Sequence, residues 1–201
     1  MAGWLAVVVV VGLGFSAAEA REGDVGPAVS SVPPSTAAAA RVAKEAARRD
    51  ATAMYVAFLD GDLDRYASYA YPGLLKLFGG KLKLIATIEK ERPSMEAKGL
   101  RIESAEVGAV TQLVETKSEL QAILPLTQVM TVPGGEVHMP GSLLGISEDR
   151  GKTWTFMDSS KLTSENVRQV LPTYDPRLKL PGPKEPKFIR KERPAYGTDS
   201  F

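Results

Sequence analysis

Residues 119–132, ELQAILPLTQVMTV, carry the pattern that decides the fold. Six of the seven even-numbered positions from 120 to 132 are apolar, and the seventh is Gln128. Because successive side chains of a β-strand point to opposite faces, this alternation predicts a long strand with one face in a hydrophobic core. Pro125 cannot donate a hydrogen bond to a neighbouring strand, so it predicts a sheet edge or a bulge.

Other strands are expected on both sides of this segment. Weaker patterns predict strands at 100–102 and around 113–114, and clearer ones predict strands at 136–147 and 153–158. The sequence Pro133-Gly134-Gly135 predicts a turn. The later part of the chain is therefore expected to form a run of antiparallel strands.

The earlier part of the chain predicts helices. Residues 37–59 are rich in Ala, which has the highest helix propensity, and they combine a polar and an apolar stripe. A short helix at 62–70, a helical turn at 74–78 and a third helix from 81 to about 92 follow, and 164–171 predicts a last short helix. Helices followed by antiparallel strands indicate the α+β class, with helices packed on one face of one curved sheet.

Length and composition limit the classes of protein. Of the 201 residues, 37–171 are expected to form a single domain, which is long enough for an ordinary core. The chain has no Cys, which excludes disulfides, thiolate nucleophiles and zinc–thiolate sites. Its formal net charge of +1 gives no bulk electrostatic reason to expect nucleic acid.

Residues 1–20 predict a cleavable signal peptide. Residues 4–15 are apolar or Gly, and as a helix they would extend about 18 Å, short of the roughly 30 Å hydrocarbon core of a bilayer. Ala18 and Ala20 fit the small-residue rule for cleavage, which predicts a periplasmic or secreted protein cut near Ala20. No Lys or Arg precedes the apolar run, and the alternatives are an uncleaved membrane anchor and a buried strand.

Two further segments differ from the domain in composition. Residues 21–36 contain Gly, Pro and Ser without an apolar period, which predicts a flexible spacer. Residues 172–201 contain six Pro, and 177–193 have seven Lys or Arg against two Glu. We expect a basic, Pro-rich tail that wraps the domain or stays disordered. The alternative is an electrostatic contact with an anionic membrane surface.

The order of elements and two stretches of sequence resemble a known superfamily. Residues 60–80, DGDLDRYASYAYPGLLKLFGG, lead into an amphipathic helix, and residues 143–158, LLGISEDRGKTWTFMD, precede a short helix and LPTYDPRLKLP at 171–181. Together they resemble the nuclear transport factor two-like (cystatin-like) superfamily, in a bacterial exported branch, over about 40–180. The resemblance implies a curved sheet wrapped on a long helix as a cone, often with a pocket. The superfamily includes isomerases, dehydratases, carriers, assembly modules and toxin-immunity proteins, so it implies no single function.

A sharper local pattern lies at 147–154, SEDRGKTW, which matches the Asp box S-x-D-x-G-x-T-W of sialidases and other propellers. In such a turn, Ser and Asp accept backbone hydrogen bonds, Gly takes a positive φ and Trp packs beneath. Propellers repeat the unit, whereas it occurs once here. It predicts a tight hairpin at 146–156 and no glycosidase chemistry.

Five residues are candidates for a pocket inside the cone. Asp50 falls on the helical line that otherwise faces the core, with Tyr55 or Tyr69 near it, although an ion pair with the adjacent arginines explains it as well. Asp158 shares strand parity with Trp154 and either points into the cone or ends the strand. The candidate pocket residues are therefore Asp50, Tyr55, Tyr69, Trp154 and Asp158.

We predict no catalytic residue, because no candidate has the neighbouring groups that known mechanisms require. His138 is the only His, it lies in a predicted strand or loop, and no Ser stands in a nucleophile-elbow context. A zinc site needs more nitrogen or sulfur ligands, and the acidic run at 60–64 has Tyr71 where a calcium loop requires Glu. We expect no metal and no cofactor.

These observations favour a non-enzymatic exported module that binds a small hydrophobic ligand or a protein partner, and a homodimer is one form of the latter. The alternative is a cofactor-independent isomerase or hydratase that uses Asp50 or Asp158 for acid–base catalysis. A third hypothesis is an envelope-surface protein whose basic tail docks on anionic lipid.

Overall fold

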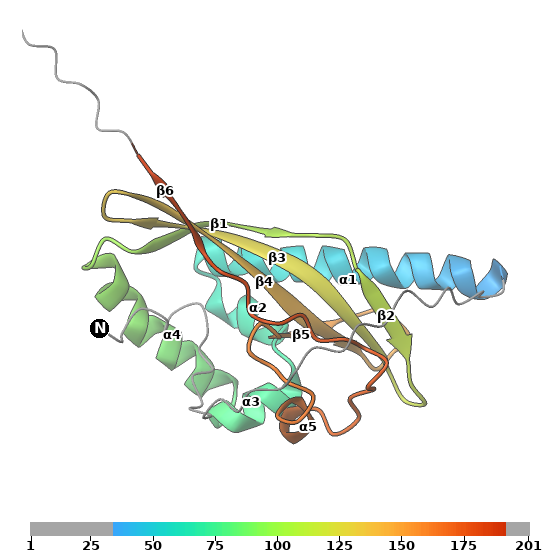
Figure 1. The fold of residues 1–201 in the computed structure, drawn as a ribbon. Helices are drawn as coiled ribbons and strands as arrows, with labels where there is room; N and C mark the ends of the chain where they lie inside the picture. Colours follow the sequence, from blue (N-terminus) through green and yellow to red (C-terminus); the bar gives the residue numbers. More distant parts are fainter. Residues whose placement is uncertain (1–33, 192–201) are drawn as a thin grey trace, which may run out of the picture.

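The computed structural model describes residues 34–191, which form five helices and a six-stranded antiparallel sheet (Figure 1). The fold is thus α+β, with the helices packed against one open sheet, as the sequence predicts. The expected signal peptide at 1–20 and most of the expected spacer at 21–36 lie outside the described residues.

The predicted long strand is the centre of the sheet. Strand β3 (Leu120–Val132) pairs along its whole length with β4 (Gly135–Ser147), from Leu120 opposite Ser147 to Val132 opposite Gly135. The other edge of β3 carries β1 (Arg101–Val107) and then β2 (Gln112–Glu115). The other edge of β4 carries β5 (Thr155–Asp158) at one end and β6 (Lys187–Arg190) at the other.

Pro125 lies in this central strand, not at a sheet edge, and its position explains why it is tolerated. Its carbonyl accepts a hydrogen bond from the N–H of Gly108, so its backbone faces the side of β1 and β2. On that side β1 ends opposite Leu126 and β2 begins opposite Ile123. The donor that proline lacks therefore falls in the gap between two partner strands.

Helix α1 (Pro34–Asp60) packs its small side chains on the sheet. Ala43, Ala47 and Ala51 are buried against the even-numbered positions of β3, as the predicted apolar stripe requires. Apart from Asp50, the charged residues of α1 are exposed. Because Ala projects only a methyl group, the helix axis can approach the sheet closely along this stretch.

Three more helices continue this side of the fold. They are α2 (Leu63–Ser68), α3 (Pro72–Phe78) and α4 (Lys81–Glu96). We expected α4 to end before Pro93, but it continues for about one more turn. Only the bond to the carbonyl of Glu89 is lost, and the extra turn buries Met95 against Met130 and Val132.

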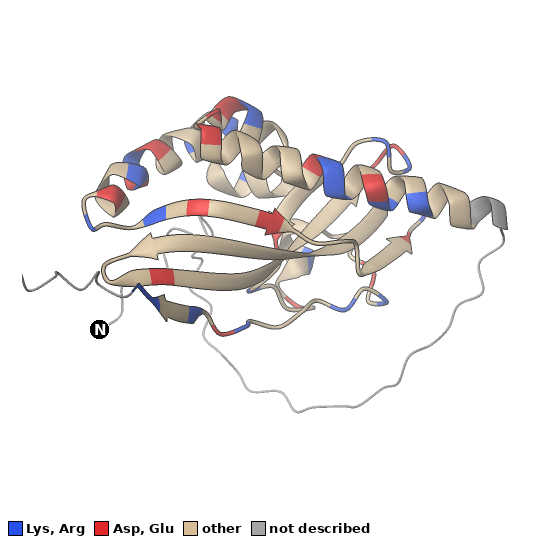
Figure 2. Cartoon of the chain, turned by 90° about the horizontal axis from the view of Figure 1, so that it is seen from above, with Lys and Arg blue, Asp and Glu red and all other residues tan. Residues whose placement is uncertain are grey.

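The opposite face of the sheet is covered by the end of the chain. Helix α5 (Val167–Val170) and residues 171–181, here called the C-terminal segment, bury Leu171, Tyr174 and Leu178 against the odd-numbered side of β3 and its neighbours. Figure 2 places α1 and α4 on one side of the sheet and the loop that leads to β6 on the other. A tail beginning at 172 is therefore not separate from the domain: it wraps the sheet and supplies core residues and strand β6.

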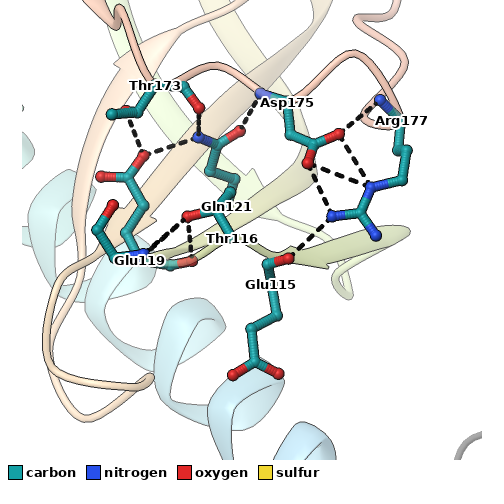
Figure 3. Close-up of polar contacts among 8 residues, drawn as sticks. Glu115, Thr116, Glu119, Gln121, Thr173, Asp175 and Arg177 are labelled. Atoms are coloured by element: carbon teal, nitrogen blue, oxygen red, sulfur yellow. Dashed lines mark hydrogen bonds and ion pairs between the residues drawn. The ribbon is translucent and has the colours of Figure 1, made fainter.

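Polar contacts hold the C-terminal segment on the β2–β3 hairpin (Figure 3). The buried amide of Gln121 donates to the carboxylate of Glu119 at 2.7 Å and to the carbonyl of Thr173 at 2.9 Å, and it accepts from the N–H of Asp175 at 3.0 Å. The Thr173 hydroxyl donates to Glu119 at 2.7 Å, and Arg177 donates to the carbonyl of Glu115 at 2.9 Å. These bonds fix the register of the segment on the sheet.

The Asp-box prediction is confirmed as a structural turn. The carboxylate of Asp149 accepts hydrogen bonds from the N–H groups of Lys152 and Thr153 and from the Thr153 hydroxyl, and Gly151 has a φ of +87°. Burial opposes ionisation of Asp149, but these bonds and one from Ser147 outweigh it and lower its pKa to about 2. Trp154 is 2% exposed and donates its indole N–H to the carbonyl of Gly151.

Candidate functional site

A cavity of about 400 Å³ lies between the helices and the sheet. One wall comes from the second half of α1 and from α2, α3 and α4, and the other comes from β1, β3, β4 and β5. Most lining side chains are apolar, among them Met54, Ile88, Leu143 and Phe156. This volume falls in the range of small-molecule sites in proteins.

Gln128 is a polar side chain set into the apolar wall of the cavity. It lies on the core face of β3, between Ala105 of β1 and Met139 of β4, and is only 4% exposed. The Gln128 amide has no hydrogen-bond partner within residues 34–191. Every fully enclosed polar side-chain atom in that range has a partner, so the amide atoms of Gln128 are not fully enclosed. The amide must therefore be reached through the cavity that it lines. It offers a donor and an acceptor to a molecule in the cavity.

A carboxylate and two phenols line the same cavity. Asp158 comes from the end of β5, Tyr55 from α1 and Tyr66 from α2. Burial raises the pKa of Tyr66 to about 12, and the nearby Asp158 adds to the shift. Burial, Tyr66 and Asp158 together raise the pKa of Tyr55 well above its ordinary value. Both phenols are therefore neutral at physiological pH and available as donors.

Asp158 is hydrogen-bonded by Ser160 and has no cationic partner within the described residues. Its Oδ1 accepts the N–H of Ser160 at 2.7 Å, and no ion pair to this carboxylate occurs within the described residues. Burial raises its pKa, although the bonds from Ser160 and the charge of Lys161 oppose the shift. The carboxylate is thus less hydrated than one on the surface and is a competent proton acceptor.

The remaining charged groups of the lining belong to α4 and β1. Arg101 and Glu103 form a two-bond ion pair, each bond 2.9 Å long. Arg92 donates to the carbonyl of Phe58 at 3.0 Å, and its guanidinium lies 5.4 Å from the centre of the Phe58 ring. Glu91 and Glu96 complete the set.

The structure brings two of the five predicted pocket residues into the cavity, Tyr55 and Asp158. Asp50 is buried elsewhere: one carboxylate oxygen accepts the N–H of Trp154 at 3.1 Å and the other pairs with Arg49 at 2.8 Å. It therefore fastens the Asp-box hairpin to α1. The ion pair that the sequence offered as the alternative explanation is present, together with this backbone bond.

Trp154 and Tyr69 do not line the cavity either. Trp154 packs in the α1 core beneath the Asp-box turn. Tyr69 packs against the same core, and its carbonyl accepts the N–H of Phe156 at 2.7 Å. The N–H of Tyr71 in turn donates to the carbonyl of Phe156. These two bonds join the chain after α2 to the outer edge of β5.

Outside the cavity, His138 is the remaining residue that the sequence analysis considered for chemistry. His138 lies on β4 opposite Lys187 of β6, with its Nε2 3.9 Å from Glu136. Within residues 34–191, no three His, Cys, Asp or Glu side chains converge as ligands for a metal ion.

Sequence reasoning missed Gln128 and Tyr66 as site residues. Gln128 is the one polar side chain on the core face of the long strand, so the break in the alternation was the available signal. Tyr66 lies on α2, and its spacing from Tyr69 in the sequence is typical of packing aromatics. Only the placement of α2 beside α1 shows that its ring reaches the same cavity as Tyr55.

A comparison of the chain with family models, curated proteins and solved structures finds no match. In the part of the chain that the structure describes, no helix combines the length and apolar character needed to cross a membrane.

Proposed function

We propose that this protein binds a small, mainly apolar molecule with a hydrogen-bonding group in the cavity between α1 and the sheet. The observation that carries the proposal is the amide of Gln128, which has no partner within residues 34–191 and lies in the wall of a cavity of about 400 Å³. Because its atoms are not fully enclosed, water or a ligand in the cavity can bond to it, whereas an apolar side chain would serve a wall that is used for packing alone. A bound ligand with a polar group can replace that water.

The order of elements supports the nuclear transport factor two-like resemblance as part of this proposal. A long first helix lies across an open antiparallel sheet, and the cavity lies between them, where the cone of that superfamily has its pocket. This likeness concerns architecture, and the choice of ligand depends on the side chains of this chain alone.

Decanol is a suitable neutral probe, because it has an apolar body and one hydroxyl. We expect isothermal titration calorimetry to show saturable binding of decanol to the protein. Gln128→Leu keeps the size of the side chain and removes its amide, so it should weaken binding about five- to tenfold, as the loss of one hydrogen bond of about 1 kcal/mol implies.

The matched control is Gln169→Leu, which changes an exposed Gln on α5 away from the cavity. It should leave the affinity for decanol unchanged. Absence of saturable binding of every apolar probe to the folded protein would overturn the proposed function, and an equal loss in both variants would remove Gln128 from the site.

A second candidate function is acid–base catalysis, and the placement of Asp158 with Tyr55 and Tyr66 favours it. A carboxylate of raised pKa can take a proton from a carbon next to a carbonyl, and a neutral phenol can donate to the oxygen that becomes negative. Asp50, the other carboxylate that the sequence offered for this role, does not line the cavity.

Conversion of a β,γ-unsaturated cyclohexenone to its conjugated isomer, followed by absorbance, tests this second function. A general base is active when ionised, so the rate should fall as the pH drops through a pKa above the ordinary value of Asp, near 4. Asp158→Asn should abolish the reaction, whereas Asp50→Asn should retain it. A rate equal to that of buffer alone would exclude this isomerase activity.

The cellular location that we propose rests on the N-terminal sequence. A signal peptide at 1–20 would place the binding domain in the periplasm or outside the cell. Whether the basic residues after 177 also contact anionic lipid is decided by vesicle binding: a variant with those Lys and Arg neutralised should lose it.

A further inference from the structure

The charges around the cavity are unbalanced. Four carboxylates line it, Glu91, Glu96, Glu103 and Asp158, against the two guanidinium groups of Arg92 and Arg101, which leaves a net charge of −2. Both guanidinium groups are engaged, Arg101 by Glu103 and Arg92 by the carbonyl and ring of Phe58.

Asp158 is a lining carboxylate that lacks a cationic partner within the described residues. Asp158 is partly buried beside apolar side chains and forms no ion pair with Lys or Arg. Lys161 is the cation that influences it, and that side chain is exposed. A charged group that is withdrawn from water gains most from a partner of opposite sign.

Aromatic side chains share the cavity with this carboxylate: the charge of Asp158 acts on Tyr55 and Tyr66, and Phe156 lies two residues before it on β5. Tyr55, Phe58, Tyr66, Phe78 and Phe156 line the cavity, and the rings of Phe58 and Tyr66 are in contact, 5.2 Å apart at an angle of 57°. The face of an aromatic ring carries partial negative charge and attracts cations. A carboxylate in the same cavity as aromatic rings is a combination that suits an organic ammonium group.

We propose that the ligand of the cavity is an organic amine, whose ammonium group pairs with Asp158 among the aromatic rings while its apolar body lies along the aliphatic wall. This inference rests on the proposed function, since it names the ligand class of the same site. Gln128 lies four residues along β3 from the position level with Asp158, so its amide binds a different polar group of the ligand.

Three probes of equal chain length separate the alternatives: decylammonium, decanol and decanoate. In calorimetric titrations at neutral pH and low salt, we expect decylammonium to bind about tenfold more tightly than decanol, and decanoate to bind most weakly. Added salt should weaken the binding of decylammonium and leave that of decanol unchanged.

Asp158→Asn keeps the shape of the side chain and removes its charge. It should lower the affinity for decylammonium about tenfold, to that of decanol, and should leave decanol binding within about twofold. Glu165→Gln, which removes an exposed carboxylate away from the cavity, is the matched control and should preserve the tenfold preference.

The outcomes separate the two proposals. If decanol binds as tightly as decylammonium, or if the preference survives in Asp158→Asn, the cation inference is wrong and the binding function stands. If none of the three probes binds, the proposed function fails as well. The probe series on the unmodified protein decides the inference even if Asp158→Asn does not fold.

Discussion

Leu178→Ala is expected to lower the free energy of unfolding by about 2–5 kcal/mol, measured by urea denaturation. Leu178 is 0% exposed and lies in the core on the second face of the sheet, with Leu171 and Tyr174. The Tyr174 hydroxyl also donates to the Leu178 carbonyl, so the neighbouring groups are held in place and cannot collapse into the space that the smaller side chain leaves. The loss therefore includes a cavity as well as lost burial.

Leu82→Ala is the matched control, because it makes the same change at a site on α4 that is 79% exposed. Its effect should stay within about 0.5 kcal/mol. Equal stability of the Leu178→Ala variant and the unmodified protein would mean that the C-terminal segment is a solvated tail, as its composition suggests. The comparison therefore tests the part of the fold in which sequence and structure differ most.

Composition misleads at the C-terminal segment because it averages over positions. Six Pro and an excess of basic residues characterise residues 172–201 as a whole, whereas the core contribution comes from Tyr174, Leu178 and the register of the chain between them. What holds this register is the Gln121 amide on β3, more than 50 residues away in sequence. No local pattern contains a contact of that kind.

The centre of the sheet was predictable for the opposite reason. The alternation along β3 is a property of one strand, and the hairpin turn at 133–135 joins it to its main partner. The sequence predicts an edge or a bulge at Pro125, because the pattern of a single strand does not show where its neighbours begin and end. The gap between β1 and β2 that accommodates it exists only in the assembled sheet.

The candidate site was half predictable. Helical period predicts that Asp50 lies on the buried side of α1 with Tyr55 or Tyr69 near it, and strand parity leaves Asp158 either pointing into the cone or ending the strand. The helical period shows which face of the helix a residue occupies but not how far along the helix axis it lies. Asp50 and Tyr55 are five positions apart, which corresponds to a rise of about 7.5 Å. At the level of Asp50 the helix meets the Asp-box hairpin, and at the level of Tyr55 it meets the cavity.

Gly151→Ala is expected to lower the free energy of unfolding by about 2–5 kcal/mol. Gly151 has a φ of +87°, and a Cβ there would lie 2.5 Å from the Cβ of Ala43, 3.1 Å from its Cα and 3.1 Å from Cδ1 of Leu120. The obstacle includes the backbone of α1, which cannot move without disturbing its contact with the sheet. Denaturation with urea measures the loss.

Gly134→Ala separates the two contributions to that loss. Gly134 has the same φ of +87° in the β3–β4 turn, but a Cβ there meets no atom within 4 Å, so this variant should lose only about 1–2 kcal/mol for the unfavourable backbone conformation. Ala43→Gly removes the nearest obstructing atom, so combining it with Gly151→Ala should recover about 1 kcal/mol or more relative to additivity. Equal losses for the two glycine variants, with no coupling to Ala43, would show that the Asp-box turn does not press on α1. In that case the bonds from Trp154 to Asp50 and from Arg49 to the carbonyl of Lys152 would fasten the hairpin to the helix.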